Sequence, residues 1–404
     1  MDNNININQT LLSSKEYKNG VILGLLVSSD LIIKLINLIL PVENILVFYY
    51  FILIVIFFFI NNIVFQTKYL LFYIFFNAYF IISFFRNPGN IYTNQFYIYF
   101  NAFYLAAGIF QFPSDYRTVF NVINKSNFLF TLYLIILVIP GYRAGTIDPN
   151  LSMGYSYTAI IGIAALLYSM GIFEFKYKRY TKIVYSICVV IEIYFLLFIS
   201  YNRGALLALG LLVFFLILSL IKSVGKRVIF TIFSGGILYY FSQYYILFFE
   251  KVYLFTSNLG IESQSLLRIV QSVKYGSFTS GRDDLYQSAI ELFLESPIIG
   301  NGIGNFSKVH GGMWPHNIFL EILTDQGVII LLAFIIFLLY FFHNLIFKNN
   351  NNLHFHFGTF LFVISIPQLL ISSSFWMNSS FWMFIIIFLI KPTKESEELD
   401  KSII

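Results

Sequence analysis

Long apolar runs alternate with short polar segments along almost the whole chain. A helix needs about 20 mostly apolar residues to cross a bilayer, and runs near this length are candidate spans. They lie near residues 20–40, 44–61, 69–85, 95–112, 127–140, 154–173, 181–200, 204–221, 228–248, 327–347, 354–373 and 377–390. Because the fifth and twelfth runs are short, the pattern predicts eleven or twelve transmembrane helices.

The organisation along the chain indicates one domain. No internal repeat, no Pro- or Gly-rich linker and no pair of broken spans is apparent. The first 20 residues are polar and the first apolar run is long enough to remain as a span, so no cleavable signal peptide is expected. The fold class predicted is all-α, a polytopic membrane helix bundle that forms a single transmembrane domain over residues 1–404.

Composition excludes several classes of protein. Of the 404 residues, 58% are hydrophobic and 11% are charged, whereas soluble domains average about 25% charged residues. A soluble enzyme is therefore excluded. The net charge of +5 is small and dispersed, so no nucleic acid is expected as a partner. Cys188 is the single cysteine, so no intramolecular disulfide forms.

The positive charges predict an orientation. Lys and Arg are enriched in cytoplasmic loops, and with the N-terminus inside, sixteen of the 25 Lys and Arg residues are cytoplasmic. Both termini are therefore predicted to be cytoplasmic. Five of the eight arginines nevertheless fall outside, and they are Arg86, Arg143, Arg203, Arg268 and Arg282. Because a guanidinium binds phosphate and carboxylate through two N–H groups, the outer face is expected to bind an anion; pairing with loop carboxylates or lipid headgroups is the alternative.

One long extramembrane segment, residues 249–315, lies between the ninth and tenth spans and is predicted to be outside. Its apolar residues recur at helical spacing from Leu266 to Val273 and from Leu285 to Phe293. Ser280 is a candidate cap of the second helix, and Pro297 lies just beyond its end. The glycine-rich residues 300–304 have no βαβ context and are expected to form a flexible turn.

A polar cluster stands at the entrance to the tenth span. Pro315 suits a first helical turn, which places His316 near a helix N-terminus, where the dipole favours the neutral ring that accepts a proton. Asn317 and Glu321 are four residues apart and share a helix face. A lone interfacial histidine is often structural, but this cluster favours a functional site.

Other charged residues inside the apolar runs indicate less. Asp30 and Lys34 are four residues apart and are expected to neutralise each other. Glu192 has no partner nearby in the sequence. His354 has a second histidine two residues away but no Cys or carboxylate nearby, so no metal site is expected.

Three segments resemble the O-antigen ligase and polymerase family. Residues 201–208, YNRGALLA, resemble its S-x-R-G-A-x-x-A segment, with Asn202 directly before the arginine where relatives often have serine. Residues 281–286 and 297–306, the latter PIIGNGIGNF, resemble its arginine helix and its P-x-x-G-x-G-x-x-x-F turn. Residues 315–321, followed by Gly327, resemble its H-N-x-x-L-E-x-x-x-x-G segment. The resemblance covers about residues 185–345.

The resemblance implies an activity. The family transfers glycan from an undecaprenyl-pyrophosphate carrier to a hydroxyl acceptor at the periplasmic face of the bacterial inner membrane, without metal, cofactor or nucleotide sugar. By resemblance, Arg203 and Arg282 bind the pyrophosphate, and His316 positions or deprotonates the acceptor hydroxyl.

Four further residues complete the expected site. Arg143 and Arg268 are expected to extend the anion site, and Asn317 and Glu321 to contact substrate. Membrane lipids are expected partners, and a chain-length regulator is a further candidate.

The acceptor remains open at this point. A polymerase uses another lipid-linked repeat as acceptor, and a ligase uses lipid A-core. The bias towards Ile, Asn, Phe, Tyr and Lys indicates an AT-rich gene, which is common in clusters that house polymerases, and favours an O-antigen polymerase-like glycosyltransferase. The alternatives are an O-antigen ligase and, from another class, a transporter or flippase for the same lipid, which broken spans near the midplane would favour.

Overall fold

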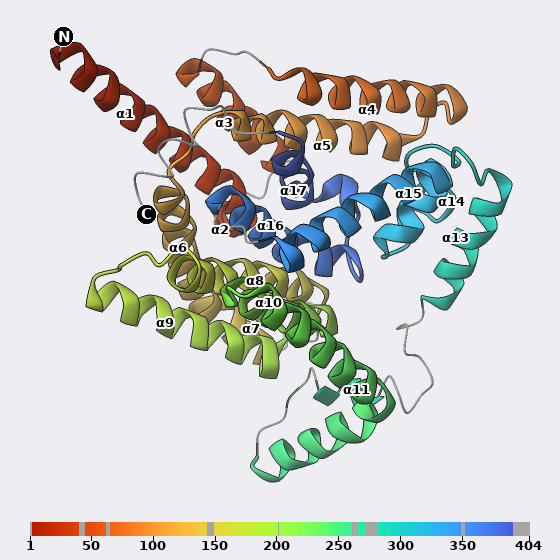
Figure 1. Ribbon diagram of the computed structural model, residues 1–404. Helices are drawn as coiled ribbons and strands as arrows, with labels where there is room; N and C mark the ends of the chain where they lie inside the picture. Colours follow the sequence, from red (N-terminus) through yellow and green to blue (C-terminus); the bar gives the residue numbers. More distant parts are fainter. Residues whose placement is uncertain are drawn as a thin grey trace.

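The fold is all-helical in the part of the chain that the structure describes. The computed structural model describes residues 2–39, 45–61, 65–143, 149–200, 202–260, 263, 266–267, 269–271, 282–348 and 352–390. Within these ranges every regular element is a helix (Figure 1). Each of the twelve apolar runs coincides with helical structure, which confirms the predicted polytopic helical membrane protein.

The helices follow one another with short connections. In the first part of the chain they are α1 (Asp2–Val27), α2 (Ser29–Ile39), α3 (Ile45–Ile60), α4 (Thr67–Arg86), α5 (Ile91–Ala107), η1 (Gly108–Gln111), α6 (Tyr116–Tyr133), η2 (Leu134–Val138), α7 (Ile139–Arg143) and α8 (Pro149–Gly171). In the second part they are α9 (Arg179–Tyr194), η3 (Phe195–Ile199), α10 (Arg203–Leu220), α11 (Val224–Asn258), α13 (Asp283–Glu295), α14 (Asn305–Val309), α15 (Ile318–Phe347), α16 (Leu353–Leu369), η4 (Phe375–Met377) and α17 (Ser379–Leu389).

Fewer helices are full-length spans than the sequence predicts. By length and composition, four helical segments of the described chain can cross a membrane, and they are Thr67–Arg86, Tyr116–Gly141, Arg179–Ile199 and Ile318–Phe347. The α1–α2 pair, bent by 62°, makes a fifth if it is one span. Four further apolar helices have 10–17 residues. Breaks and kinks therefore shorten several of the runs that were expected to span.

The bend between α1 and α2 corrects the expectation that no span is broken. It lies at Ser28, whose Oγ donates to the backbone oxygen of Gly24 at 2.7 Å. In α2, Lys34 Nζ donates to the backbone oxygen of Gly154 at 2.5 Å and to Thr158 Oγ1. Asp30 is exposed, so the expected pairing of Lys34 with Asp30 gives way to hydrogen bonds with α8.

Helix α16 forms the centre of the bundle. Its residues 357–367 are all buried, as is typical of a helix that is apolar all round. It packs against α17, α10 and α8, and Figure 1 shows it between the orange helices α3–α5 and the green helices α8–α10. A cluster of aromatic rings, which includes Phe76, Phe100, Trp376 and Trp382, joins α17 and η4 to α4 and α5. This packing fixes the turn that follows α16.

The long loop has the helical content that its periodicity predicts. Helix α13 begins at Asp283 and ends at Glu295, before Pro297. Its N-cap residue is Arg282, whereas the candidate cap Ser280 lies outside the described residues. In the first amphipathic stretch, Leu266, Ile269 and Val270 are buried.

Arg227, in the first turn of α11, joins the C-terminal ends of α10 and α15. Its side chain is 6% exposed. Nε donates to the backbone oxygen of Ile221 at 2.8 Å and Nη2 to that of Lys222 at 3.1 Å, after α10. Nη1 donates to the backbone oxygens of Leu345 at 2.9 Å and Lys348 at 2.6 Å, at the end of α15. One guanidinium thus satisfies the terminal carbonyls of two helices, where a cation is also favoured by the helix dipoles.

We expect Arg227→Gln to destabilise the protein. A hydrogen bond to a charged group contributes about 1.5–3 kcal/mol, so the free energy of unfolding, measured by denaturant titration in mixed micelles, should fall by about 2–4 kcal/mol. Lys226→Gln, at an exposed neighbouring position, is the matched control. Equal stability of the two variants would contradict the proposed role of Arg227.

Candidate functional site

The turn after α16 brings two of the predicted site residues together. Arg282 Nη1 donates to the backbone oxygen of Ile371. His316 Nδ1 lies 3.1 Å from the backbone oxygen of Ser372, to which Trp314 Nε1 also donates at 3.2 Å. Arg282 precedes α13 and His316 precedes α15. The guanidinium and the imidazole therefore contact adjacent carbonyls, although their segments are separate in the sequence.

The contact with Ser372 fixes which nitrogen of His316 carries the proton. A carbonyl oxygen only accepts hydrogen bonds, so Nδ1 donates, and in the neutral ring Nε2 is the free acceptor. Burial lowers the pKa of His316 below its usual 6.5, and the charge of Arg282 lowers it further, while the Ser372 carbonyl opposes both. The neutral ring that the sequence predicts is therefore favoured by burial and by Arg282.

The backbone around His316 differs from the prediction. His316 has a φ of 55°, and α15 begins at Ile318 with Asn317 as its N-cap. Pro315 therefore precedes the helix, and its predicted place in the first turn is wrong. The left-handed backbone is uncommon for a residue with a side chain and turns the ring of His316 towards the turn after α16.

The start of α10 reaches the same turn. Asn202 caps α10, since its Oδ1 accepts from Gly204 N at 2.9 Å and from Ala205 N at 3.3 Å. A Cβ on Gly204 would lie 2.0 Å from the Tyr157 hydroxyl, so the glycine leaves room for Tyr157. That hydroxyl lies 2.9 Å from Ser372 Oγ. Arg203 is the first residue of α10, and its side chain lies outside the described part of the chain.

Asn317 and Glu321 make internal hydrogen bonds. Asn317 Oδ1 accepts from Phe319 N at 3.0 Å and from Leu320 N at 3.3 Å. Glu321 is 2% exposed. Its Oε1 accepts from Ser374 Oγ and its Oε2 from Phe375 N, the latter at 3.2 Å. Asn317 therefore shapes the entrance to α15, and Glu321 holds the same turn that Arg282 and His316 contact.

The glycine-rich segment is a tightly bonded loop, and the expectation of a flexible turn is wrong. The three glycines of residues 300–304 have φ values between 67° and 94°, a region that favours glycine. Asn301 N donates to the backbone oxygen of Thr324 at 2.8 Å, and Gly302 N to that of Asp325 at 3.0 Å. The loop therefore pairs with α15 at its kink.

Glycine is also required on the other side of this contact. Gly327, at the kink of α15, has φ 79° and ψ −177°. A Cβ there would lie 2.3 Å from the backbone oxygen of Ile298. The kink releases Val328 N, which donates to the backbone oxygen of Pro297 at 2.9 Å. Arg86 holds the loop from α4, because its Nη2 donates to Ser296 Oγ at 3.2 Å and its Nη1 to the loop backbone.

The other predicted residues divide into described and undescribed ones. Arg143 is the last residue of α7, and its side chain lies outside the described part; Arg268 lies outside it altogether. Glu192, in α9, is fully buried and accepts from Thr131 Oγ1 at 2.6 Å, a partner that the sequence does not reveal. His354 bonds the Tyr116 hydroxyl through Nδ1 at 2.9 Å and the backbone oxygen of Ile387 through Nε2 at 3.0 Å.

Sequence reasoning missed the residues that gather the site. Tyr157, Trp314, Ile371 and Ser372 lie in none of the segments that it assigned to chemistry. The apolar run 354–373 was taken as a span through Ile371 and Ser372, whereas α16 ends at Leu369. The signal available was the run of three serines at residues 372–374, which interrupts two apolar segments.

The geometry agrees with a comparison with known proteins. Residues 187–335 match the family model described as O-antigen ligase. The match confirms the resemblance, and it assigns this region of the chain to the O-antigen polymerase and ligase family. The curated proteins and the solved structures gave no match. The matched region contains Arg203, Arg282 and His316, whereas Tyr157 and the turn after α16 lie outside it.

Two glycine substitutions test whether the loop is held against α15. A Cβ at Gly300 would lie 2.4 Å from the backbone of Asp325, whereas a Cβ at Gly311 would meet nothing within 4 Å. Their φ values are 67° and 60°, so the left-handed backbone costs a similar ~1–2 kcal/mol at both positions. We expect Gly300→Ala to lose about 1–3 kcal/mol more than Gly311→Ala, measured by thermal unfolding in detergent. Equal losses would mean that the loop does not depend on this close contact.

Proposed function

We propose that the protein is an O-antigen polymerase-like glycosyltransferase, which joins undecaprenyl-pyrophosphate-linked oligosaccharide repeats at the periplasmic face of the bacterial inner membrane. One observation carries the proposal: Arg282 and His316 contact the adjacent carbonyls of Ile371 and Ser372. An anion-binding group and a proton acceptor are thus held side by side, as transfer from a pyrophosphate donor to a hydroxyl requires.

The guanidinium groups act on the donor. Among the described residues, Nη1 is the one nitrogen of Arg282 with a hydrogen-bond partner, so Nε and Nη2 are available for phosphate oxygens. Arg203 is placed beside it at the start of α10, with Arg143 and Arg268 as extensions of the anion site. As the bond between the anomeric carbon and the pyrophosphate oxygen breaks, negative charge develops on that oxygen. Guanidinium groups fixed beforehand stabilise this charge.

His316 acts on the acceptor. Its Nε2 takes the proton of the acceptor hydroxyl while the hydroxyl oxygen attacks the anomeric carbon and undecaprenyl pyrophosphate leaves. Such general-base help typically contributes 10²–10⁴-fold to the rate. The neutral ring is required for this step, and the burial of His316 and the charge of Arg282 both favour it.

Asn317 and Glu321 support the two reacting groups. Within the described chain the amide nitrogen of Asn317 has no hydrogen-bond partner, so it is available for a sugar hydroxyl beside His316. Both oxygens of Glu321 bond the turn at Ser374 and Phe375. Glu321 is therefore a positioning residue, because it holds the turn on which Arg282 and His316 rest.

The ligase alternative uses the same donor site. It differs in the acceptor, which is lipid A-core instead of a second lipid-linked repeat, and the described contacts concern the donor and the base. The compositional bias of the gene supports the polymerase. The bent α1–α2 pair is the type of feature that a transporter uses, but it lies outside the segments that carry Arg203, Arg282 and His316.

The pH dependence of transfer tests the pairing of Arg282 with His316. A base must be neutral, and the pKa of His316 lies below its usual 6.5, so kcat/KM should decline with acid to half its plateau below pH 6.5. Arg282→Gln removes one cause of the lowered pKa. We expect its residual activity, reduced about 10²–10³-fold, to show this decline at higher pH.

Two variants serve as controls in the same initial-rate assay with a lipid-linked donor. Arg282→Lys keeps the charge but loses the two-point fork, so the decline should stay where it is in the wild type. His316→Gln should abolish the decline and cost about 10²–10⁴-fold in rate. An unchanged pH profile in both Arg282→Gln and His316→Gln would show that His316 is not the titrating base.

A deletion strain separates the polymerase from the ligase. Without a polymerase, the separate ligase still attaches single repeats, so the lipopolysaccharide should run as one band above the bare core on a gel. Without a ligase, the core stays bare and long glycan accumulates on the undecaprenyl carrier. We expect the single-repeat band; a bare core with accumulated polymer would establish the ligase.

A further inference from the structure

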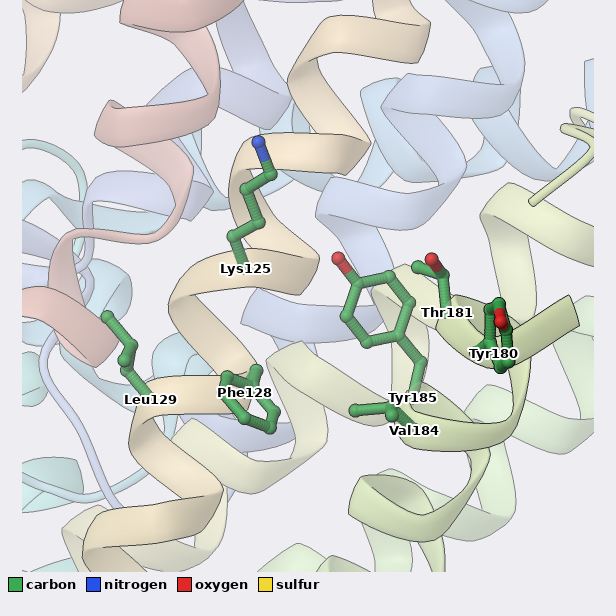
Figure 2. A pocket seen from close by; sticks show the side chains of 7 residues that line it. All are labelled: Lys125, Phe128, Leu129, Tyr180, Thr181, Val184 and Tyr185. Atoms are coloured by element: carbon green, nitrogen blue, oxygen red, sulfur yellow. The ribbon is translucent and has the colours of Figure 1, made fainter. Parts of the chain in front are cut away.

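A groove of about 450 Å³ lies between α6 and α9 (Figure 2). Phe128 and Leu129 of α6 and Val184 of α9 line its apolar part. Leu129 is 53% exposed and Val184 is 38% exposed, so no other part of the described chain covers them. Both helices meet the length and composition of membrane spans, which places the groove in contact with lipid.

The groove is polar at one end and apolar at the other. Figure 2 shows the ammonium of Lys125 and the hydroxyl groups of Thr181 and Tyr185 at the upper end of the view, with Phe128 and Val184 below them. A hydrocarbon chain alone would need no such polar end. The shape and chemistry instead match a molecule with a charged head and an apolar tail.

Further cations stand beside the polar end. Lys178, Arg179 and Lys182, at the start of α9, are all exposed. Lys178 and Lys182 are three or four residues from Thr181 or Tyr185, and such spacing places side chains on neighbouring parts of one helix face. With Lys125, they form a positive rim, which is complementary to a phosphate.

The groove and the candidate site lie at opposite ends of one span. The span Arg179–Ile199 has 21 residues, which at 1.5 Å per residue is about 30 Å, the thickness of the hydrocarbon core. The groove lies at its first turns, and Asn202 of the site lies just beyond its end. The groove therefore belongs to the other leaflet and is separate from the glycan-transfer site.

We propose that this groove is a binding site for an anionic glycerophospholipid of the leaflet opposite the candidate site. One acyl chain lies along Phe128, Leu129 and Val184, and the phosphate lies at Lys125 and the cations of α9. Basic pockets between transmembrane helices bind anionic headgroups in this way. The lipid fills the space between α6 and α9 and stabilises the packing of the helix that leads to Asn202.

Lipid titration of the purified, delipidated full-length chain tests the proposal. Native mass spectrometry gives the affinity for dioleoyl-phosphatidylglycerol and for dioleoyl-phosphatidylcholine, which has the same chains and no net charge. We expect a saturable site that prefers phosphatidylglycerol at least about ten-fold, because several cations each contribute about 1 kcal/mol. Glycerol phosphate, which has no acyl chain, should not compete.

Matched variants separate the head from the tail. Lys125→Gln should weaken phosphatidylglycerol about five-fold and leave phosphatidylcholine unchanged, whereas Lys308→Gln, at an exposed lysine of α14, should change neither. Val184→Trp fills the groove and should weaken both lipids and remove the rise in melting temperature that phosphatidylglycerol gives. Val190→Trp, 65% exposed on the same helix outside the groove, should not.

Three results would overturn the site. Equal affinity for the two lipids would leave only non-specific membrane contact. Competition by glycerol phosphate as strong as that by phosphatidylglycerol would indicate a free-phosphate site. Unchanged binding in Val184→Trp would place the lipid elsewhere. None of these measurements depends on glycan transfer, so their failure would leave the proposed enzyme activity standing.

Discussion

The carbonyls left free where α16 ends are the constraint on which the site depends. A backbone oxygen inside a membrane protein needs a partner, and a helix end provides none from its own backbone. Arg282 supplies the partner for Ile371, and His316 and Trp314 supply it for Ser372. Satisfying the turn and assembling the site are therefore the same interaction, and neither can be lost alone.

Helix α15 carries this constraint into the rest of the fold. Glu321 bonds the turn through Ser374. One helical turn further, Asp325 Oδ2 accepts from Gly304 N and from Trp376 Nε1, each at 3.2 Å. These two buried carboxylates fasten the turn and the glycine loop to one helix. At the opposite end, Arg227 ties α15 to α10, so the two helices that begin at the site also end together.

The sequence predicts what depends on local pattern. Apolar runs predict every helix that bears the site, and the spacing of the motifs identifies Arg282 and His316. It does not predict contacts between distant segments: Tyr157 and Ser372 are 215 residues apart, and neither belongs to a recognisable motif. Glu321 illustrates the same limit, because a carboxylate at a span entrance has the pattern of a ligand whether it faces substrate or a neighbouring turn.

The frame also explains why burial and chemistry coincide at His316. Its left-handed backbone costs free energy, and the bond to Ser372 together with the Asn317 cap holds it there. The same bond directs Nε2 away from the turn and leaves it as the acceptor. The nearby guanidinium of Arg282 keeps the ring neutral and has donors left for a phosphate. A donor that brought its own negative charge to Arg282 would offset that effect and raise the proton affinity of His316 when the acceptor must be deprotonated.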